Sequence, residues 1–326
     1  MLATNLKCPL LRSVRQFHSS TTSSMQVHHH HHHKSHHQRH KRSYSSARHV
    51  LINFGFQFPH DFKLGSGRYS KVYKGFYREA NRYFAIKITD LEAVSDRFKH
   101  KFVPRELKVW RELSHPNHVR LYKDFMKNDF LFEIIDLAVG GDMLNYLRNH
   151  GPVKEAVCSG WMLQLVDALS YLHQKRIVHR DLKLENILIF DRDVIKITDY
   201  GFCKQCCDDE LSSTFCGTKS YKAPEILQST DYDPFKADVW SLGIVGYVML
   251  TNRMPFRGDV STAHLVEAQR SRRYRFPSQM SVTEHCRCTI DNMLTFEPDD
   301  RPSIFDVRNL PWFASAVNDA NSDALS

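Results

Sequence analysis

The chain has 326 residues, which is enough for one large domain or for two lobes that share a cleft. Its apolar fraction of 42% and charged fraction of 25% are ordinary for a soluble globular protein. The longest apolar run, Leu242–Leu250, is much shorter than the roughly 18 residues of a transmembrane helix. We therefore expect no membrane span, and a buried core helix at this run.

The net charge of +9 is concentrated at the N-terminal end. The first 60 residues contain eight Lys or Arg and no acidic residue, whereas the rest holds 37 basic and 36 acidic residues. The remainder is therefore almost neutral, and the basic composition gives no reason to expect nucleic-acid binding by the folded part.

Residues 1–57 are rich in Ser and His and poor in core-forming residues, which predicts a disordered basic tail. Residues 1–24 lack acids and space apolar residues at helical intervals, as a mitochondrial transit peptide does, but Pro9 favours a merely solvated tail. The histidine run His28–His40 is interpreted as native low complexity rather than a tag or a physiological metal site. We expect a cytoplasmic protein, with mitochondrial targeting as the alternative.

From Phe58 onward, short β-rich segments alternate with turns, interrupted by one helical stretch around Lys101–Ser114. After Gly151 the apolar residues recur at three- and four-residue steps, which is typical of helices. This order predicts an α+β fold in which a small antiparallel sheet with one main helix precedes a larger, mostly helical lobe. A nucleotide cleft between the two is the natural site.

Two motifs in the β-rich part suggest phosphate binding. In "LGSGRYSKV", Gly65 and Gly67 allow the backbone to approach a phosphate, and a strand rather than a helix follows, which argues against a Rossmann dinucleotide site. "FAIK" ends a strand on Lys87, whose ammonium could neutralise phosphate oxygens. Glu106 lies 19 residues further on and could hold that ammonium.

The string "VHRDLKLENILIF", followed by "ITDYG" and then "APE", completes an ordered series of motifs. With this series the chain resembles the protein kinase family over residues 58–313. The resemblance implies a bilobal kinase fold, an N-lobe at 58–137 and a C-lobe at 138–313, followed by a short polar tail at 314–326. It also implies ATP and Mg²⁺ as cofactors, proteins as substrates, and a monomeric state.

The resemblance assigns the chemistry to four residues of the second lobe. Asp181 would accept the proton of the substrate hydroxyl, and Lys183 would lie against the transferring phosphoryl group. Asn186 and Asp199 would hold magnesium.

It assigns nucleotide contacts to the glycine-rich loop, the following strand, the hinge and the floor of the site. Asp142 would bind the ribose, and the backbone of Asp136–Ala138 would meet adenine beside Ile135. The complete set is Leu64, Gly65, Ser66, Gly67, Arg68, Tyr69, Ser70, Lys71, Val72, Ala85, Lys87, Asp136, Ala138, Asp142 and Leu188.

The segment from Asp199 to Glu225 resembles an activation segment. Thr214 occupies the position that is commonly phosphorylated, and Arg180 could pair with its phosphate. The resemblance also predicts a buried ion pair between Arg301 and Glu225, and a bracing role for Asp238.

Lys183 and Thr218 favour Ser/Thr specificity, and strings such as "KFVPREL", "AVGGDML" and "DYGFCK" resemble the testis-specific serine kinases of the calmodulin-dependent kinase group. The tail after Trp312 is too short for a calmodulin-regulated helix. Asp142 and Glu185 predict a preference for basic residues upstream of the phosphoacceptor. Tyr200, where this family usually has Phe, should pack under the helix of Glu106 and needs a partner for its hydroxyl.

Two alternatives remain. A pseudokinase scaffold would usually have lost Lys87, Asp181 or Asp199, and all three are present. A zinc site built from Cys203, Cys206, Cys207 and Cys216 lacks a regular second pair, so these cysteines are interpreted as reduced thiols on a mobile loop, with oxidation of Cys216 as a regulatory alternative. The physiological substrate, the upstream kinase and the need for Thr214 phosphorylation are not encoded in any of these motifs.

Overall fold

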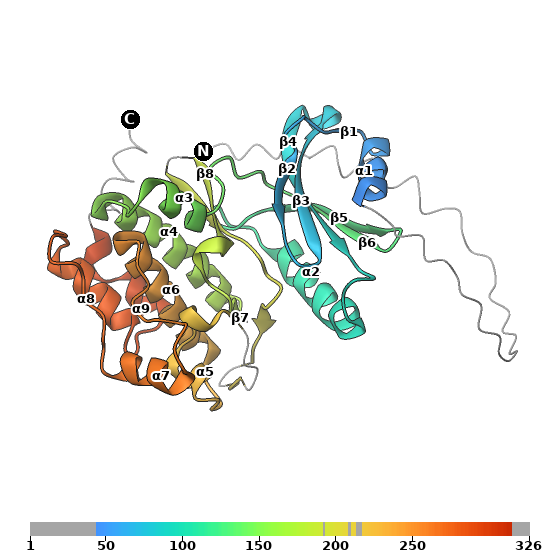
Figure 1. Ribbon diagram of the computed structural model, residues 1–326. Coiled ribbons are helices and arrows are strands. Elements are labelled where there is room, and N and C mark those ends of the chain that lie inside the picture. Colours follow the sequence, from blue (N-terminus) through green and yellow to red (C-terminus); the bar gives the residue numbers. More distant parts are fainter. Residues whose placement is uncertain (1–43, 192, 208–209, 213–216, 315–326) are drawn as a thin grey trace, which may run out of the picture. The chain divides into compact units, whose positions relative to one another are not determined.

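A computed structural model describes residues 44–191, 193–207, 210–212 and 217–314 (Figure 1). The basic segment, the histidine run, Thr214, Cys216 and the tail from residue 315 lie outside these described residues. Contacts divide the chain into two compact units: the first contains the part up to Ser95 together with Leu121–Leu137, and the second contains Asp96–Arg120 and the part from Ala138 onward.

This division differs from the one expected, because residues 96–120 group with the second unit rather than the first. The reason is a set of long-range hydrogen bonds. Asn117 Nδ2 donates to the carbonyl of Ile195 at 2.9 Å, and the amide of Val119 donates to the carbonyl of Ile197 at 2.9 Å. These bonds tie the segment after the predicted helix to a strand of the second unit.

The first unit is built on an antiparallel sheet with the order β1-β3-β4-β6-β5, and β2 pairs with β3. Its strands are β1 (Phe56–Gln57), β2 (Lys63–Ser66), β3 (Ser70–Tyr77), β4 (Arg82–Asp90), β5 (Leu121–Lys127) and β6 (Phe130–Ile135). A 3-10 turn at Arg78–Ala80 joins β3 to β4, where Asn81 takes the left-handed conformation with φ of 49°.

Alternation along the strands gives this sheet two different faces. One face carries the aromatic and aliphatic core of the unit, including Tyr73, Phe84, Ile86 and Phe132. The other face carries Lys87, directly opposite Glu133 in the register between β4 and β6.

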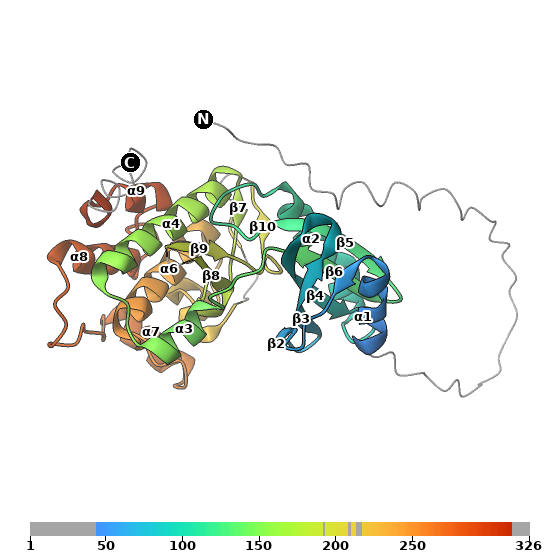
Figure 2. The same ribbon diagram turned by 90° about the horizontal axis from the view of Figure 1, so that it is seen from above.

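Helix α1 (Tyr44–Asn53) is a correction to the sequence prediction. Residues 44–57 were expected to belong to a disordered tail, but they form α1 and β1 and pack on the core face of the sheet (Figures 1 and 2). Ala47, Val50 and Leu51 are buried there. The segment contains too few apolar residues for the sequence to predict a helix. The apolar face of the sheet stabilises the helix by burying the few apolar side chains that it has.

The second unit is mostly helical, which confirms the predicted α+β class. Its α-helices are α2 (Val103–Glu112), α3 (Met143–His150), α4 (Glu155–Gln174), α5 (Pro224–Leu227), α6 (Pro234–Thr251), α7 (Thr262–Arg270), α8 (Glu284–Met293) and α9 (Ile304–Arg308). A π-helical turn at Phe98–Phe102 precedes α2, and 3-10 turns lie at Leu184–Asn186, Lys219–Tyr221 and Pro311–Phe313. Two short antiparallel pairs, β7 (Ile177–Val178) with β10 (Lys204–Gln205) and β8 (Ile187–Asp191) with β9 (Val194–Ile197), complete it.

Helix α6 contains the long apolar run and is buried on nearly all sides, as its sequence predicts. Arg301, which is completely buried, makes the predicted ion pair with Glu225, with two N–O distances of 2.8 and 3.1 Å. The guanidinium also lies 5.1 Å from the ring centre of Trp240 on α6. Within the described residues, no helix combines the length and apolarity that crossing a bilayer would require.

Candidate active site

The predicted catalytic loop lies between β7 and β8 and is held by hydrogen bonds to Asp238 of α6. The carboxylate of Asp238 accepts hydrogen bonds from the backbone amides of His179 and Arg180, both at 2.8 Å, and lies 3.2 Å from Nε2 of His173. Arg180 has a positive φ of 66°, a strained conformation for a non-glycine residue. The bonds from Asp238 hold the loop in this shape, which is the bracing role predicted for it.

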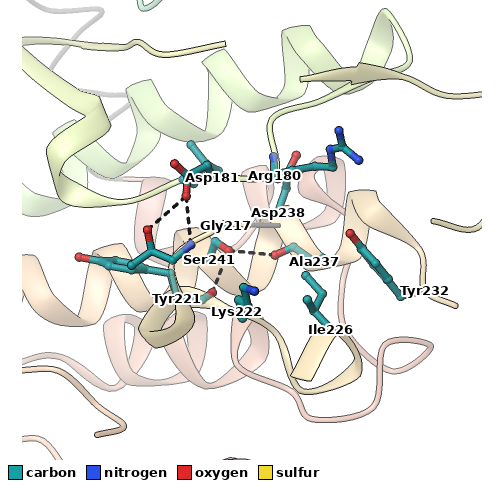
Figure 3. A pocket seen from close by; sticks show the side chains of 12 residues that line it. Arg180, Asp181, Gly217, Tyr221, Lys222, Ile226, Tyr232, Ala237, Asp238 and Ser241 are labelled. Carbon is teal, nitrogen blue, oxygen red and sulfur yellow. Dashed lines mark hydrogen bonds between the residues drawn. The ribbon is translucent and has the colours of Figure 1, made fainter. Parts of the chain in front are cut away.

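Asp181 is buried and lines the pocket drawn in Figure 3. Its carboxylate is held by three neighbouring residues. Lys183 Nζ donates to Oδ2 at 2.7 Å, and the amide and hydroxyl of Thr218 donate to Oδ1 at 3.2 and 3.3 Å. Asn186 Nδ2 donates to the backbone carbonyl of Asp181 at 2.9 Å and to Oδ2 at 3.3 Å. Three of the residues assigned to chemistry by sequence, Asp181, Lys183 and Asn186, therefore meet at one point.

Asn186 and Asp199 offer oxygen ligands of the kind that Mg²⁺ prefers. The side-chain amide nitrogen of Asn186 donates to Asp181, so the amide oxygen is the atom of this group that could coordinate a metal ion. Asp199 follows β9 and has a positive φ of 66°. A β-carbon added to Gly201 would lie 3.4 Å from Asp199 Oδ1 and 3.5 Å from Glu106 Oε2, so the predicted α2 carboxylate lies in the same region as Asp199.

The ring of Tyr200 is buried and packs on α2, as predicted, with its centre 5.2 Å from that of Trp110. The single hydrogen of its hydroxyl is shared between two acceptors, the carbonyl of Ile197 at 2.9 Å and Nδ1 of His118, also at 2.9 Å. The other ring nitrogen of His118 lies 3.0 Å from the carbonyl of Ala168. Burial lowers the pKa of His118 to about 3, so the ring is neutral near pH 7 and Nδ1 acts as an acceptor.

Within the first unit, Lys87 has an acidic neighbour that the sequence motifs do not indicate. Its Nζ lies 3.5 Å from Oε2 of Glu133, whose side chain is only 1% exposed. The single sequence signal is an acidic residue in the middle of the apolar strand "FLFEII". A carboxylate so deeply buried depends on a cationic neighbour for its charge.

The glycine-rich loop is the hairpin of β2 and β3, and it closes with a hydrogen bond from the amide of Gly67 to the carbonyl of Ser70 at 2.8 Å. Val72 pairs with Lys87 in the register, and Ala85 lies two residues before Lys87 on the same strand face. Lys71 belongs to the opposite face, where its Nζ lies 4.0 Å from the ring centre of Tyr44. Among the predicted nucleotide contacts, Lys71 can therefore contribute only its backbone.

The side chains of the predicted hinge and ribose residues also make hydrogen bonds within their own units. Asp136 accepts a hydrogen bond from the hydroxyl of Tyr122 at 2.7 Å. Asp142 caps α3 by accepting from the amide of Asn145 at 2.9 Å, and its backbone forms a bridge with Leu188. Residues 138–142 thus lie beside β8 in the second unit.

The activation segment approaches the catalytic loop closely at Gly217, which has φ of 89°. A β-carbon there would lie 2.8 Å from the carbonyl of Arg180, so this position requires glycine. Arg180 donates from Nε to the carbonyl of Phe202 at 2.7 Å, and within the described residues its buried Nη1 has no hydrogen-bond partner.

The cysteines correct another expectation. Cys203 and Cys206 are buried rather than exposed on a loop, whereas Cys207 is exposed. Burial raises the pKa of the Cys203 thiol well above its ordinary value, which keeps it protonated and unreactive. Within the described residues, which exclude Cys216, no group of three His, Cys, Asp or Glu side chains is arranged to hold a metal.

Comparison with known proteins agrees with this geometry. The model of the protein kinase domain matches residues 58–313, and the chain therefore belongs to the protein kinase family. Human testis-specific serine/threonine-protein kinase 4 is 33% identical over 285 residues, covering 82% of this chain and 85% of the relative. Mouse testis-specific serine/threonine-protein kinase 3 is 37% identical over 270 residues, covering 81% and 98%.

A relative from Dictyostelium discoideum, the probable serine/threonine-protein kinase MARK-A, is 34% identical over 253 residues, covering 77% of this chain but 24% of the relative. The match covers 85% and 98% of the two testis-specific kinases named above, and the resemblance stated from the sequence is confirmed.

Proposed function

We propose that this chain transfers the γ-phosphoryl group of ATP to serine or threonine hydroxyls of protein substrates. The observation that carries the proposal is the set of contacts around Asp181. A buried carboxylate held by Lys183, Asn186 and both donors of Thr218 is fixed in orientation, as a residue that must meet a substrate hydroxyl needs to be.

In this proposal Asp181 orients the hydroxyl and accepts its proton, while the ammonium of Lys183 lies beside the same carboxylate and offsets phosphoryl charge. Asn186 and Asp199 would hold Mg²⁺, which would neutralise charge on the phosphate oxygens when bound. Lys87 would contact the nucleotide phosphates, and Glu106 would orient Lys87. The glycine-rich loop, Asp136, Ala138, Asp142 and Leu188 would form the nucleotide site.

The direct test is transfer of labelled phosphate from ATP to a basic peptide that contains either Ser, Thr or Tyr as the only hydroxyl acceptor. The wild type should label the Ser and Thr peptides, and Asp181→Asn should lower the rate by about 10²–10⁴-fold. Asp299→Asn, which changes an exposed carboxylate of the same unit, is the matched control. If the wild type bound ATP but transferred no phosphate, the pseudokinase scaffold would be the better description.

For substrate preference, we propose that Glu185 selects a basic residue upstream of the phosphoacceptor. Its side chain is exposed, whereas Asp142 already accepts two hydrogen bonds from Asn145. Glu185→Gln should therefore reduce the advantage of an Arg-containing peptide over its Ala counterpart more than Asp142→Asn does. An equal preference in all three proteins would contradict this assignment.

For regulation, we propose that phosphorylated Thr214 binds Arg180, whose buried Nη1 has a hydrogen available for it. Thr214→Ala should then lower activity, and mass spectrometry of the active wild type should find phosphate at this residue. Full activity of Thr214→Ala would show that the segment is ordered without the modification.

A further inference from the structure

Helix α1 precedes the part of the chain that matches the kinase domain, yet it belongs to the core of the first unit. The match begins at residue 58, whereas α1 spans Tyr44–Asn53. Its buried face joins the sheet core through Ala47, Val50 and Leu51. The helix therefore covers the face of the sheet opposite Lys87 (Figure 2).

The first residue of α1 contacts the glycine-rich loop directly. The hydroxyl of Tyr44 donates to the backbone carbonyl of Tyr69 at 3.0 Å. The same carbonyl also accepts from the amide of Asp90, the last residue of β4, at 2.9 Å, one residue before β3 begins. Tyr44 thus adds a second bond at the point where the loop leaves the sheet.

The ring of Tyr44 makes two further contacts that fix its position. The ammonium of Lys71, which follows Tyr69 by two residues, lies 4.0 Å from the ring centre, in the range of a cation–π interaction. The ring of Phe130 on β6 lies 5.6 Å away between centres. The ring therefore packs on the sheet, while among the residues that the structure describes the hydroxyl bonds only to the loop carbonyl.

We propose that α1 is a positioning element of the nucleotide loop and that Tyr44 is the residue through which it acts. This inference rests on the proposed role of the loop in binding ATP. A loop that covers phosphates must be held near its bound conformation, and each bond at its base reduces the conformational freedom lost on binding.

The substitution Tyr44→Phe separates the hydrogen bond to the loop from the packing of the ring, because it removes the hydroxyl and keeps the ring on Lys71 and Phe130. Tyr83→Phe is the matched control. Tyr83 lies on β4 with the ammonium of Lys74 4.5 Å from its ring centre, and its side chain is exposed. It therefore repeats the cation–π contact without a hydrogen bond to the loop in the described residues.

The experiment uses the full chain, with steady-state kinetics at varied ATP and hydrogen exchange of the free protein. Tyr44→Phe should raise the KM for ATP about 2- to 10-fold, the equivalent of one lost hydrogen bond, and leave kcat within twofold. Exchange at the amides of Gly67 and Asp90 should become faster. Tyr83→Phe should match the wild type in both measurements.

Unchanged KM and unchanged exchange in Tyr44→Phe would overturn the inference. If the wild type neither bound ATP nor transferred phosphate, the proposed function would fail, but hydrogen exchange would still decide whether Tyr44 restrains the loop. A change in thermal stability without any change in exchange at Gly67 would assign Tyr44 a purely structural role and would also overturn it.

Discussion

Lys87 and Glu133 face each other across the ladder between β4 and β6, with Nζ 3.5 Å from Oε2. The lysine is the residue predicted to contact the nucleotide phosphates, so a buried carboxylate on the same sheet adds negative charge beside the proposed phosphate site. Charges separated by a few ångströms in a partly desolvated site influence each other by about 1 kcal/mol or more.

The first prediction concerns this extra charge. Glu133→Gln keeps the shape of the side chain and removes its charge, so nucleotide phosphates should be repelled less and the KM for ATP should fall about fivefold. Glu112→Gln, an exposed acid on α2, should leave KM unchanged. A higher KM in Glu133→Gln would instead show that Glu133 is needed to hold Lys87 in place.

The second prediction concerns the stability of lysine variants. Lys87→Met removes a cation from beside a carboxylate that is 1% exposed and should lower the free energy of unfolding by about 3 kcal/mol. Adding Glu133→Gln should restore most of that loss, because neither side chain of the pair then carries a charge. Denaturant unfolding of the two single variants and the double variant measures the coupling, and simple additivity would contradict the ion pair.

The third prediction concerns the packing of α1. Leu51 is completely buried, and Leu51→Ala should lower the free energy of unfolding by about 2–5 kcal/mol. Its neighbour Ile52 is 51% exposed, and Ile52→Ala should change stability by no more than about 0.5 kcal/mol. Equal and small effects would mean that α1 is not part of the folded unit in solution.

The fourth prediction concerns the buried hydroxyl of Tyr200. Tyr200→Phe leaves Nδ1 of His118 without its hydrogen-bond donor and should cost about 1–3 kcal/mol of stability. Phosphoryl transfer should change only modestly, since no group assigned to catalysis is removed. In a double-mutant cycle with His118→Leu, the combined loss should be smaller than the sum of the two single losses. Complete loss of activity would show that the hydroxyl has a further role in phosphoryl transfer.

The fifth prediction concerns pH. The folded-state pKa of His118, about 3, lies below the ordinary value of 6.5, so the unfolded chain binds a proton first as the pH falls. The contribution to stability is therefore complete above about pH 6.5 and decreases progressively toward pH 3. His118→Leu should show a weaker decline in the free energy of unfolding between pH 6.5 and pH 4.5. The same slope in both proteins would indicate that His118 is not buried in solution.

Sequence motifs predict the candidate catalytic residues because each motif is local. His179 to Asn186 form one loop between two short strands, and their spacing already requires a tight turn. The ion pair of Arg301 with Glu225 and the bracing by Asp238 could be predicted only through the family resemblance, since 76 residues separate Arg301 from Glu225 along the chain.

Other features depend on which surfaces meet in three dimensions. The segment around Tyr44 was expected to be disordered. It forms a helix because three of its apolar side chains are buried against the sheet of the first unit. The spacing of Cys203 and Cys206 is typical of metal ligands. Their burial, which the structure shows and the spacing does not, contradicts the expected place on a mobile loop. Apolar contacts of this kind are not specified by any short pattern.

The sequence by itself determined the family and the order of the two parts, and it named Asp181, Lys183, Asn186 and Asp199 as candidate site residues, because these depend on residue types at fixed local spacing. Tertiary structure alone decided that Glu133 lies beside Lys87, that His118 receives the hydroxyl of Tyr200, and that Tyr44 reaches the glycine-rich loop. Each of these contacts joins elements whose register or packing is set by the burial of side chains from distant parts of the chain.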